Sequence, residues 1–128
     1  MMDCANTAQL AQRFSDAIEA TDLQALEQIY APDAVIWYNF DNSEHTRAEN
    51  IAVIATFPRL FSAFKYTQVR RNYFEGGFVQ QHVVRATRVS GESFAVPACM
   101  VVRVRGDRIV RLDEYFDSAQ DARRPEDR

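Results

Sequence analysis

The chain has 128 residues and a formal net charge of −3, with 47% hydrophobic and 26% charged residues. This length predicts one domain that buries its own core, and the composition is that of an ordinary globular protein. The slightly acidic balance gives no electrostatic reason for a nucleic acid partner, and no run approaches the ~18 apolar residues of a membrane span.

The first half of the chain predicts helices separated by one strand. Apolar residues at spacings of three and four predict an amphipathic helix over 6–20 and a shorter one over 23–30, which Pro32 ends. The β-branched and aromatic run 34–38 predicts a strand, followed by a polar loop that continues through 41–45.

A long third helix is expected next. Thr46 and Glu49 have the spacing of a capping box at its start. The helix carries Phe57, Phe61 and Phe64 on one side, and Pro58 should kink or divide it.

The second half predicts four long strands, over 66–75, 78–89, 93–105 and 108–117. Short glycine-containing connections suit hairpins, so the last three strands should form an antiparallel meander. Pro97 inside a strand indicates an edge, a bulge or a bend, and therefore a strongly curved sheet. Residues 118–128 have no apolar anchor and predict a flexible tail, which leaves 1–117 as the domain.

Glu114 interrupts the apolar face of the last strand. Alternation places it on the same face as Val110, Leu112 and Phe116, where an apolar residue is expected. A carboxylate in such a place is usually hydrogen-bonded, paired, or held neutral with a raised pKa. Pairing with one of the arginines, or a strand end that meets water, would also explain it.

The order of elements resembles the SnoaL-like and ketosteroid-isomerase-like branch of the nuclear transport factor 2-like superfamily. Two segments carry this resemblance, 22–35 and 107–117, and it extends over roughly 10–117. It implies an α+β fold in which a cone-shaped, curved antiparallel or mixed sheet wraps around a long helix, with two further N-terminal helices, as a cystatin-like α+β barrel. It also implies an apolar pocket in the cone and commonly a homodimer through the sheet.

The resemblance also bears on the site. The closing strand looks like that of limonene epoxide hydrolase, and the catalytic aspartate of that strand falls on Glu114. The general-base aspartate of ketosteroid isomerase falls on Tyr38, and the hydrolase Arg-x-Asp pair has no counterpart near Gln81. Neither known catalytic set is complete, so neither activity transfers by name.

Three residues are candidates for catalysis: Glu114 as acid/base, Tyr38 as donor to a substrate oxygen, and His82 as a base near neutral pH. Strand parity leaves the face of His82 open, because the hydrolase alignment puts Val79, Gln81, Val83 and Arg85 toward the pocket. Tyr38 can equally be a tyrosine at the mouth of a core. The expected substrate-binding residues are Trp37, Asn39, Gln81, Phe57, Phe61 and Leu112.

The leading hypothesis is a cofactor-free enzyme that acts on a small, apolar, oxygenated substrate by isomerase, cyclase, dehydratase or epoxide hydrolase chemistry. The alternative is a non-catalytic ligand-binding or dimerisation module of the same fold. No metal site is expected, because no His-x-His, Cys-x-x-Cys or His-Glu-x-x-His spacing occurs. Without a recognisable signal peptide or a disulfide pattern, the expected compartment is the cytoplasm.

Overall fold

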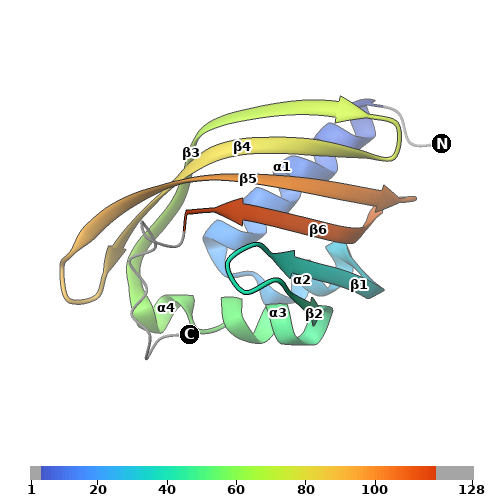
Figure 1. The fold of residues 1–128 in the computed structure, drawn as a ribbon. Coiled ribbons are helices and arrows are strands. Elements are labelled where there is room, and N and C mark those ends of the chain that lie inside the picture. Colours follow the sequence, from blue (N-terminus) through green and yellow to red (C-terminus); the bar gives the residue numbers. More distant parts are fainter. Residues whose placement is uncertain (1–3, 118–128) are drawn as a thin grey trace.

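The computed structural model describes residues 4–117, which form an α+β fold of helices packed on one curved sheet (Figure 1). The expected fold class is confirmed. Within these residues the six strands have the order β2-β1-β6-β5-β4-β3, so the sheet is open rather than a closed barrel. The tail expected over 118–128 lies outside the described residues.

The helices are α1 (Cys4–Ala20), α2 (Leu23–Ile29), α3 (Arg47–Ile54) and α4 (Phe57–Leu60). Helices α2 and α3 begin at side chains that cap them, Asp22 and Thr46. The capping box of α3 is confirmed: the Glu49 amide donates to Thr46 Oγ1 at 3.1 Å, and the Thr46 amide donates to Glu49 Oε1 at 2.8 Å. No helix of residues 4–117 is long and apolar enough to cross a membrane.

The expected long third helix is wrong beyond Ile54. The helical stretch breaks after α3, and Pro58 lies in the first turn of the short α4, where a missing N–H costs nothing. The chain then enters β3 directly at Phe61. Phe61 and Phe64 therefore belong to a strand, although they share the concave side of the fold with Phe57 as expected.

The strands are β1 (Tyr30–Tyr38), β2 (Ser43–Thr46), β3 (Phe61–Phe74), β4 (Gly77–Arg88), β5 (Ser93–Arg105) and β6 (Arg108–Phe116). β4, β5 and β6 form the expected antiparallel meander, while β1 pairs with β6 in parallel. Residues 43–45 were expected to belong to a loop. They lie instead in β2, an edge strand that pairs with β1. Its short, mostly polar sequence has no alternating pattern that would indicate a strand.

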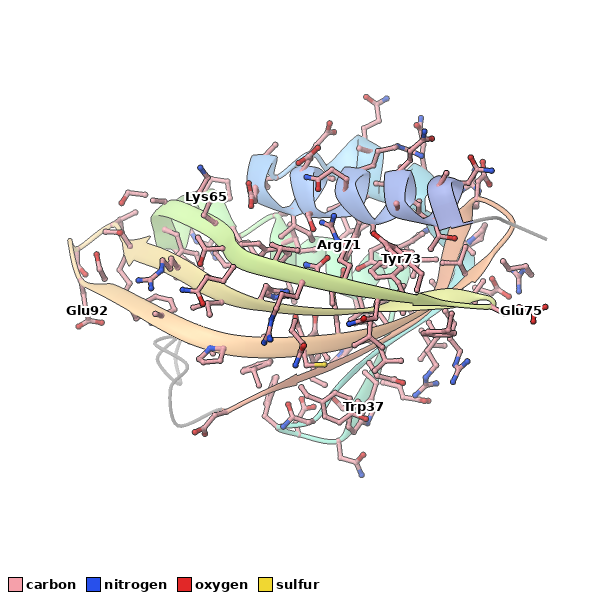
Figure 2. The ribbon with its side chains drawn as sticks, turned by 90° about the horizontal axis from the view of Figure 1, so that it is seen from above. Trp37, Lys65, Arg71, Tyr73, Glu75 and Glu92 are labelled. Atoms are coloured by element: carbon pink, nitrogen blue, oxygen red, sulfur yellow. The ribbon has the colours of Figure 1, made fainter. Side chains whose placement is uncertain are left out.

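Helix α1 covers one face of the sheet, which we call the inner face. Figure 2 shows Arg71 and Tyr73 on the side of β3 toward α1, and Trp37 on the opposite, outer face. The inner face of β4 carries alternate residues, all of them buried or half-buried: Phe78, Gln80, His82, Val84 and Ala86. The main core lies between this face and α1, with Leu10, Phe14, Ile36, Met100 and Val102 almost fully buried.

Candidate functional site

A cavity of about 110 Å³ lies between the inner face of the sheet and the helices. Rings dominate its wall. Its lining residues include Phe14, Tyr30, Tyr38, Asn50, Val53, Phe57, Phe61, Phe64, Tyr66, Phe94, Leu112, Glu114 and Phe116. Among the described lining residues Glu114 is the one with a carboxylate, so charge enters this apolar space at a single place.

Two of the expected catalytic residues meet in this cavity. Glu114 on β6 and Tyr38 on β1 are direct partners in the parallel ladder, so their side chains leave the sheet on the same face. Glu114 is half-buried. The alternation of side chains along β6 therefore predicted the face of Glu114 correctly, and the pairing of β1 with β6 brings Tyr38 beside it.

A buried amide holds the Tyr38 hydroxyl. Asn50, on α3, is only 4% exposed. The Tyr30 hydroxyl donates to Asn50 Oδ1 at 2.9 Å, and Asn50 Nδ2 donates to the Tyr38 oxygen at 2.7 Å. With the amide oxygen of Asn50 accepting from Tyr30, its NH₂ end faces Tyr38. A phenol that accepts one hydrogen bond keeps its own O–H as a donor.

The sequence argument missed Asn50. The signal was available, since Asn50 lies four residues before the buried Ile54 and hence on the core face of α3.

The tyrosines around Glu114 are held neutral. Burial raises the pKa of Tyr30 and of Tyr66 well above 10, and the nearby Glu114 charge raises both further. Glu114 and both phenols line the same cavity. The polar end of the cavity therefore combines one carboxylate with neutral hydroxyl donors.

Asn39 prolongs the ladder that aligns Tyr38 with Glu114. Its backbone N–H donates to the Glu114 carbonyl at 3.1 Å. Its side chain donates from Nδ2 to the Phe116 carbonyl at 3.1 Å and accepts from the Phe116 amide at 3.0 Å. The side-chain amide thus takes the place of one further residue of strand.

His82 points to the inner face and is 3% exposed, which settles the parity left open by the sequence. It is not a wall residue of the cavity. Its ring stacks on Tyr66, which is one, with centroids 4.1 Å apart and planes at 19°. His82 therefore supports the wall from behind Tyr66.

A chain of hydrogen bonds sets the tautomer of His82. Arg71 Nε donates to Gln80 Oε1 at 2.8 Å, so the NH₂ end of Gln80 faces His82 Nδ1 at 3.0 Å. Nδ1 must then accept, and the ring proton lies on Nε2. Nε2 is buried and has no hydrogen-bond partner among the described residues.

These contacts keep His82 uncharged. Burial lowers the pKa of His82 to about 4, with a further contribution from the positive charge of Arg71. The expected role of His82 as a base near neutral pH is therefore not supported, because its one acceptor nitrogen is already occupied.

The remaining expected substrate-binding residues divide into two groups. Phe57, Phe61 and Leu112 line the cavity. Trp37, Asn39 and Gln81 do not, and their expected placement is corrected: Asn39 caps the ladder, and Gln81 is an exposed residue of the outer face.

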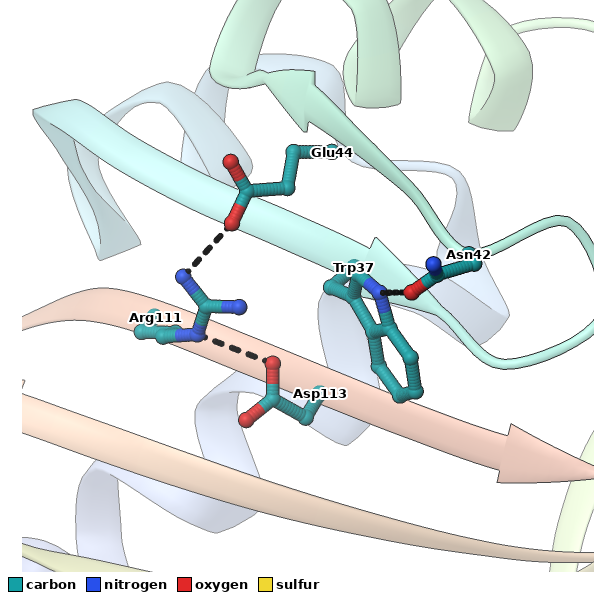
Figure 3. A network of polar contacts seen from close by, with 5 residues as sticks. All are labelled: Trp37, Asn42, Glu44, Arg111 and Asp113. Carbon is teal, nitrogen blue, oxygen red and sulfur yellow. Dashed lines mark hydrogen bonds and ion pairs between the residues drawn. The ribbon is translucent and has the colours of Figure 1, made fainter.

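Trp37 belongs to a polar network on the outer face (Figure 3). Its indole N–H donates to Asn42 Oδ1 at 2.9 Å, and its ring packs edge-on against Tyr115. Arg111 nearby bridges Glu44 and Asp113 at 3.0 and 2.9 Å.

The outer face also carries Cys99 and Val101, whereas Phe78 and Val84 face inward. An open hollow of about 540 Å³, lined in part by Gln81, Cys99 and Tyr115, lies on this outer face. Among residues 4–117 no group of three His, Cys, Asp or Glu side chains is placed to hold a metal ion.

A SnoaL-like domain model matches residues 11–112. No curated protein shows a significant sequence match to the chain. Among solved structures, a SnoaL-like polyketide cyclase assigned provisionally from Shewanella denitrificans is 14% identical with a TM-score of 0.81, covering 91% of this chain and 93% of that one.

Two further structures share the fold. IdmH from Streptomyces antibioticus, described as a polyketide cyclase candidate, is 20% identical with a TM-score of 0.79, covering 89% of this chain and 94% of that one. A hypothetical protein with a ketosteroid isomerase-like fold from Catenulispora acidiphila, in complex with trimethylamine, is 18% identical with a TM-score of 0.78 over 89% of each chain.

Proposed function

Since this chain belongs to the SnoaL-like domain family, we propose that it is a small-molecule enzyme of the isomerase or cyclase type, acting by proton transfer next to a substrate carbonyl. The observation that carries the proposal is the pairing of Glu114 with Tyr38 at the polar end of an apolar cavity. An enclosed apolar pocket with a few convergent polar groups is the usual form of a small-molecule site.

Glu114 serves as the acid/base. Its carboxylate takes a proton from the carbon beside the carbonyl, and the electron pair of the broken C–H bond moves onto the carbonyl oxygen. The carboxyl group then returns the proton to another carbon; alternatively, the enolate carbon attacks a second carbonyl and closes a ring, and the carboxyl group gives its proton to the alkoxide oxygen that this forms. No oxidant or reductant is needed, and general acid/base catalysis of this kind contributes about 10²–10⁴-fold.

Tyr38 stabilises the charge that develops on the substrate oxygen. The hydrogen bond from Asn50 fixes the position of the Tyr38 oxygen and favours donation of its O–H toward the cavity. The buried Tyr30 holds Asn50 in turn. A donor that is fixed before the reaction needs no reorganisation as charge develops, which is the main advantage of such an arrangement.

The test is deuterium incorporation from D₂O into a panel of cyclic ketones and enones, followed by proton NMR. Glu114→Gln should reduce exchange at least 100-fold while ligand binding is retained. Glu44→Gln is the matched control, because Glu44 is an exposed carboxylate paired with Arg111 on the outer face.

Unchanged exchange in Glu114→Gln would remove Glu114 from the mechanism. Ligand binding by the wild-type protein without any exchange would instead favour a non-catalytic ligand-binding module.

A further inference from the structure

Four phenylalanines fill the end of the cavity away from Glu114. Phe57 and Phe64 have ring centroids 4.8 Å apart, Phe57 and Phe61 5.6 Å, Phe61 and Phe64 5.7 Å, and Phe61 and Phe94 5.9 Å. We call Phe57, Phe61, Phe64 and Phe94 the aromatic cluster. They come from α4, β3 and β5, so three separate elements converge on this space.

A small residue allows the rings to converge. Ala86 on β4 is the register partner of both Phe64 on β3 and Phe94 on β5. A methyl group between the two rings leaves the space above β4 to the aromatic side chains. Phe57 joins the same space from α4, the short helix that leads directly into β3 at Phe61.

The cavity changes from polar to apolar along its length. Tyr38 and Glu114 form one end, and Phe94 lies six residues along β5 from Met100, the register partner of Glu114. Tyr66 also lines the cavity, and its ring contacts Phe64 with centroids 5.9 Å apart. Beyond Phe64 lie the other rings of the aromatic cluster. A ligand that matches this order has an oxygen at one end and a hydrocarbon body at the other.

The space inside the cavity is small. An apolar cavity of about 150 Å³ is known to accommodate one benzene molecule, and the cavity here measures about 110 Å³. One ring therefore fills it. A carboxylate or phosphate on the ligand would meet the Glu114 charge in a space of low polarity, which is unfavourable.

On the basis of the proposed function, we propose that the substrate is an uncharged carbonyl compound with a single small ring or an equally short chain, and that the aromatic cluster sets this size limit. The carbonyl oxygen lies at Tyr38 and the ring lies against Phe64. Fused two-ring and steroid-sized ketones are excluded by the rings of the cluster.

The experiment measures binding of three enones that differ only in size: cyclohex-2-enone, a fused two-ring enone and a four-ring steroid enone. Isothermal titration calorimetry with the wild-type protein should show binding of cyclohex-2-enone and at least 10-fold weaker binding of both larger compounds. Phe64→Ala should improve binding of the two-ring enone at least 10-fold, and Phe64→Leu is a second variant with a smaller loss of packing.

Two further variants sharpen the result. Ala98→Leu places extra carbons at the cavity wall and should abolish binding of cyclohex-2-enone. Phe74→Ala removes a 38% exposed ring that lies outside the cavity, under the Arg103 guanidinium, and should leave the size profile unchanged.

Equal binding of the two-ring enone by the wild-type protein, or no binding of cyclohex-2-enone, would overturn the size limit. Binding does not depend on turnover, so it is separate from the test of Glu114. Selective binding of one-ring enones without deuterium exchange would refute the proposed chemistry and leave the size limit standing.

Discussion

Acidification should destabilise this protein through His82. The folded state holds the pKa of His82 at about 4, against an ordinary value of 6.5. Between these two pH values the unfolded chain binds a proton that the folded protein excludes. The contribution of neutral His82 to the unfolding free energy is therefore fully present above pH 6.5 and is lost as the pH drops toward 4. At about 1.4 kcal/mol for each pKa unit, the difference of about 2.5 corresponds to about 3–4 kcal/mol.

Urea unfolding of the wild-type protein and His82→Phe at pH 7.5 and pH 4.5 measures this contribution. Phenylalanine keeps a ring against Tyr66 but cannot titrate. By pH 4.5 the wild-type protein should lose about 2–3 kcal/mol more of its unfolding free energy than His82→Phe does. His45→Phe, which removes the other histidine, should keep the wild-type pH dependence.

Equal losses in the wild-type protein and His82→Phe would refute the reasoning. So would an NMR titration in which the His82 ring becomes protonated near pH 6.5, or a nitrogen spectrum that shows the proton on Nδ1 instead of Nε2.

Three other predictions rest on contacts of the site and of the helix that borders it. Tyr38→Phe should lower kcat about 10²–10³-fold with little change in ligand affinity, as measured by exchange kinetics and calorimetry; equal kcat would show that the phenol does not contact the substrate oxygen. Thr46→Ala should reduce the unfolding free energy measured in urea by about 1 kcal/mol, because it removes the hydroxyl that caps α3. An unchanged unfolding free energy would mean that the capping box does not stabilise the fold. Gln80→Glu puts an acceptor beside Nδ1 of His82, so the pKa of His82 should rise from about 4 in an NMR titration; a constant value would disprove the role of Gln80 in setting the tautomer.

The face of Glu114 was predictable because its strand has a clean pattern near its end. Leu112, Glu114 and Phe116 alternate, and all three line the cavity. The pattern fails earlier in the strand, where a bulge between the Arg103 and Val104 pairings puts Ile109, and not Val110, in the core. A bulge depends on the partner strand, which the local sequence does not specify.

The inner face of β4 was not predictable in this way. Both of its faces mix apolar and polar residues, so alternation does not choose between Gln80 and Gln81. Gln80 is buried because Arg71 and Ser15 supply its hydrogen bonds from elsewhere in the chain. Only the tertiary structure brings those partners together.

Phe61 and Phe64 were assigned to a helix for a related reason. A spacing of three residues suits one side of a helix, and Pro58 indicated a break but not whether a helix or a strand comes after it. The sequence identified these rings as wall residues but not the element that carries them.

Asn39 makes the pairing of Tyr38 with Glu114 independent of the loop that comes after it. Because this one side chain satisfies both backbone groups of Phe116, β1 can end without leaving the neighbouring strand unpaired. The connection between β1 and β2 can therefore gain or lose residues without shifting Tyr38 against Glu114. Variants of this chain could be engineered by exchanging this connection alone, with the relative placement of Tyr38 and Glu114 carried over intact.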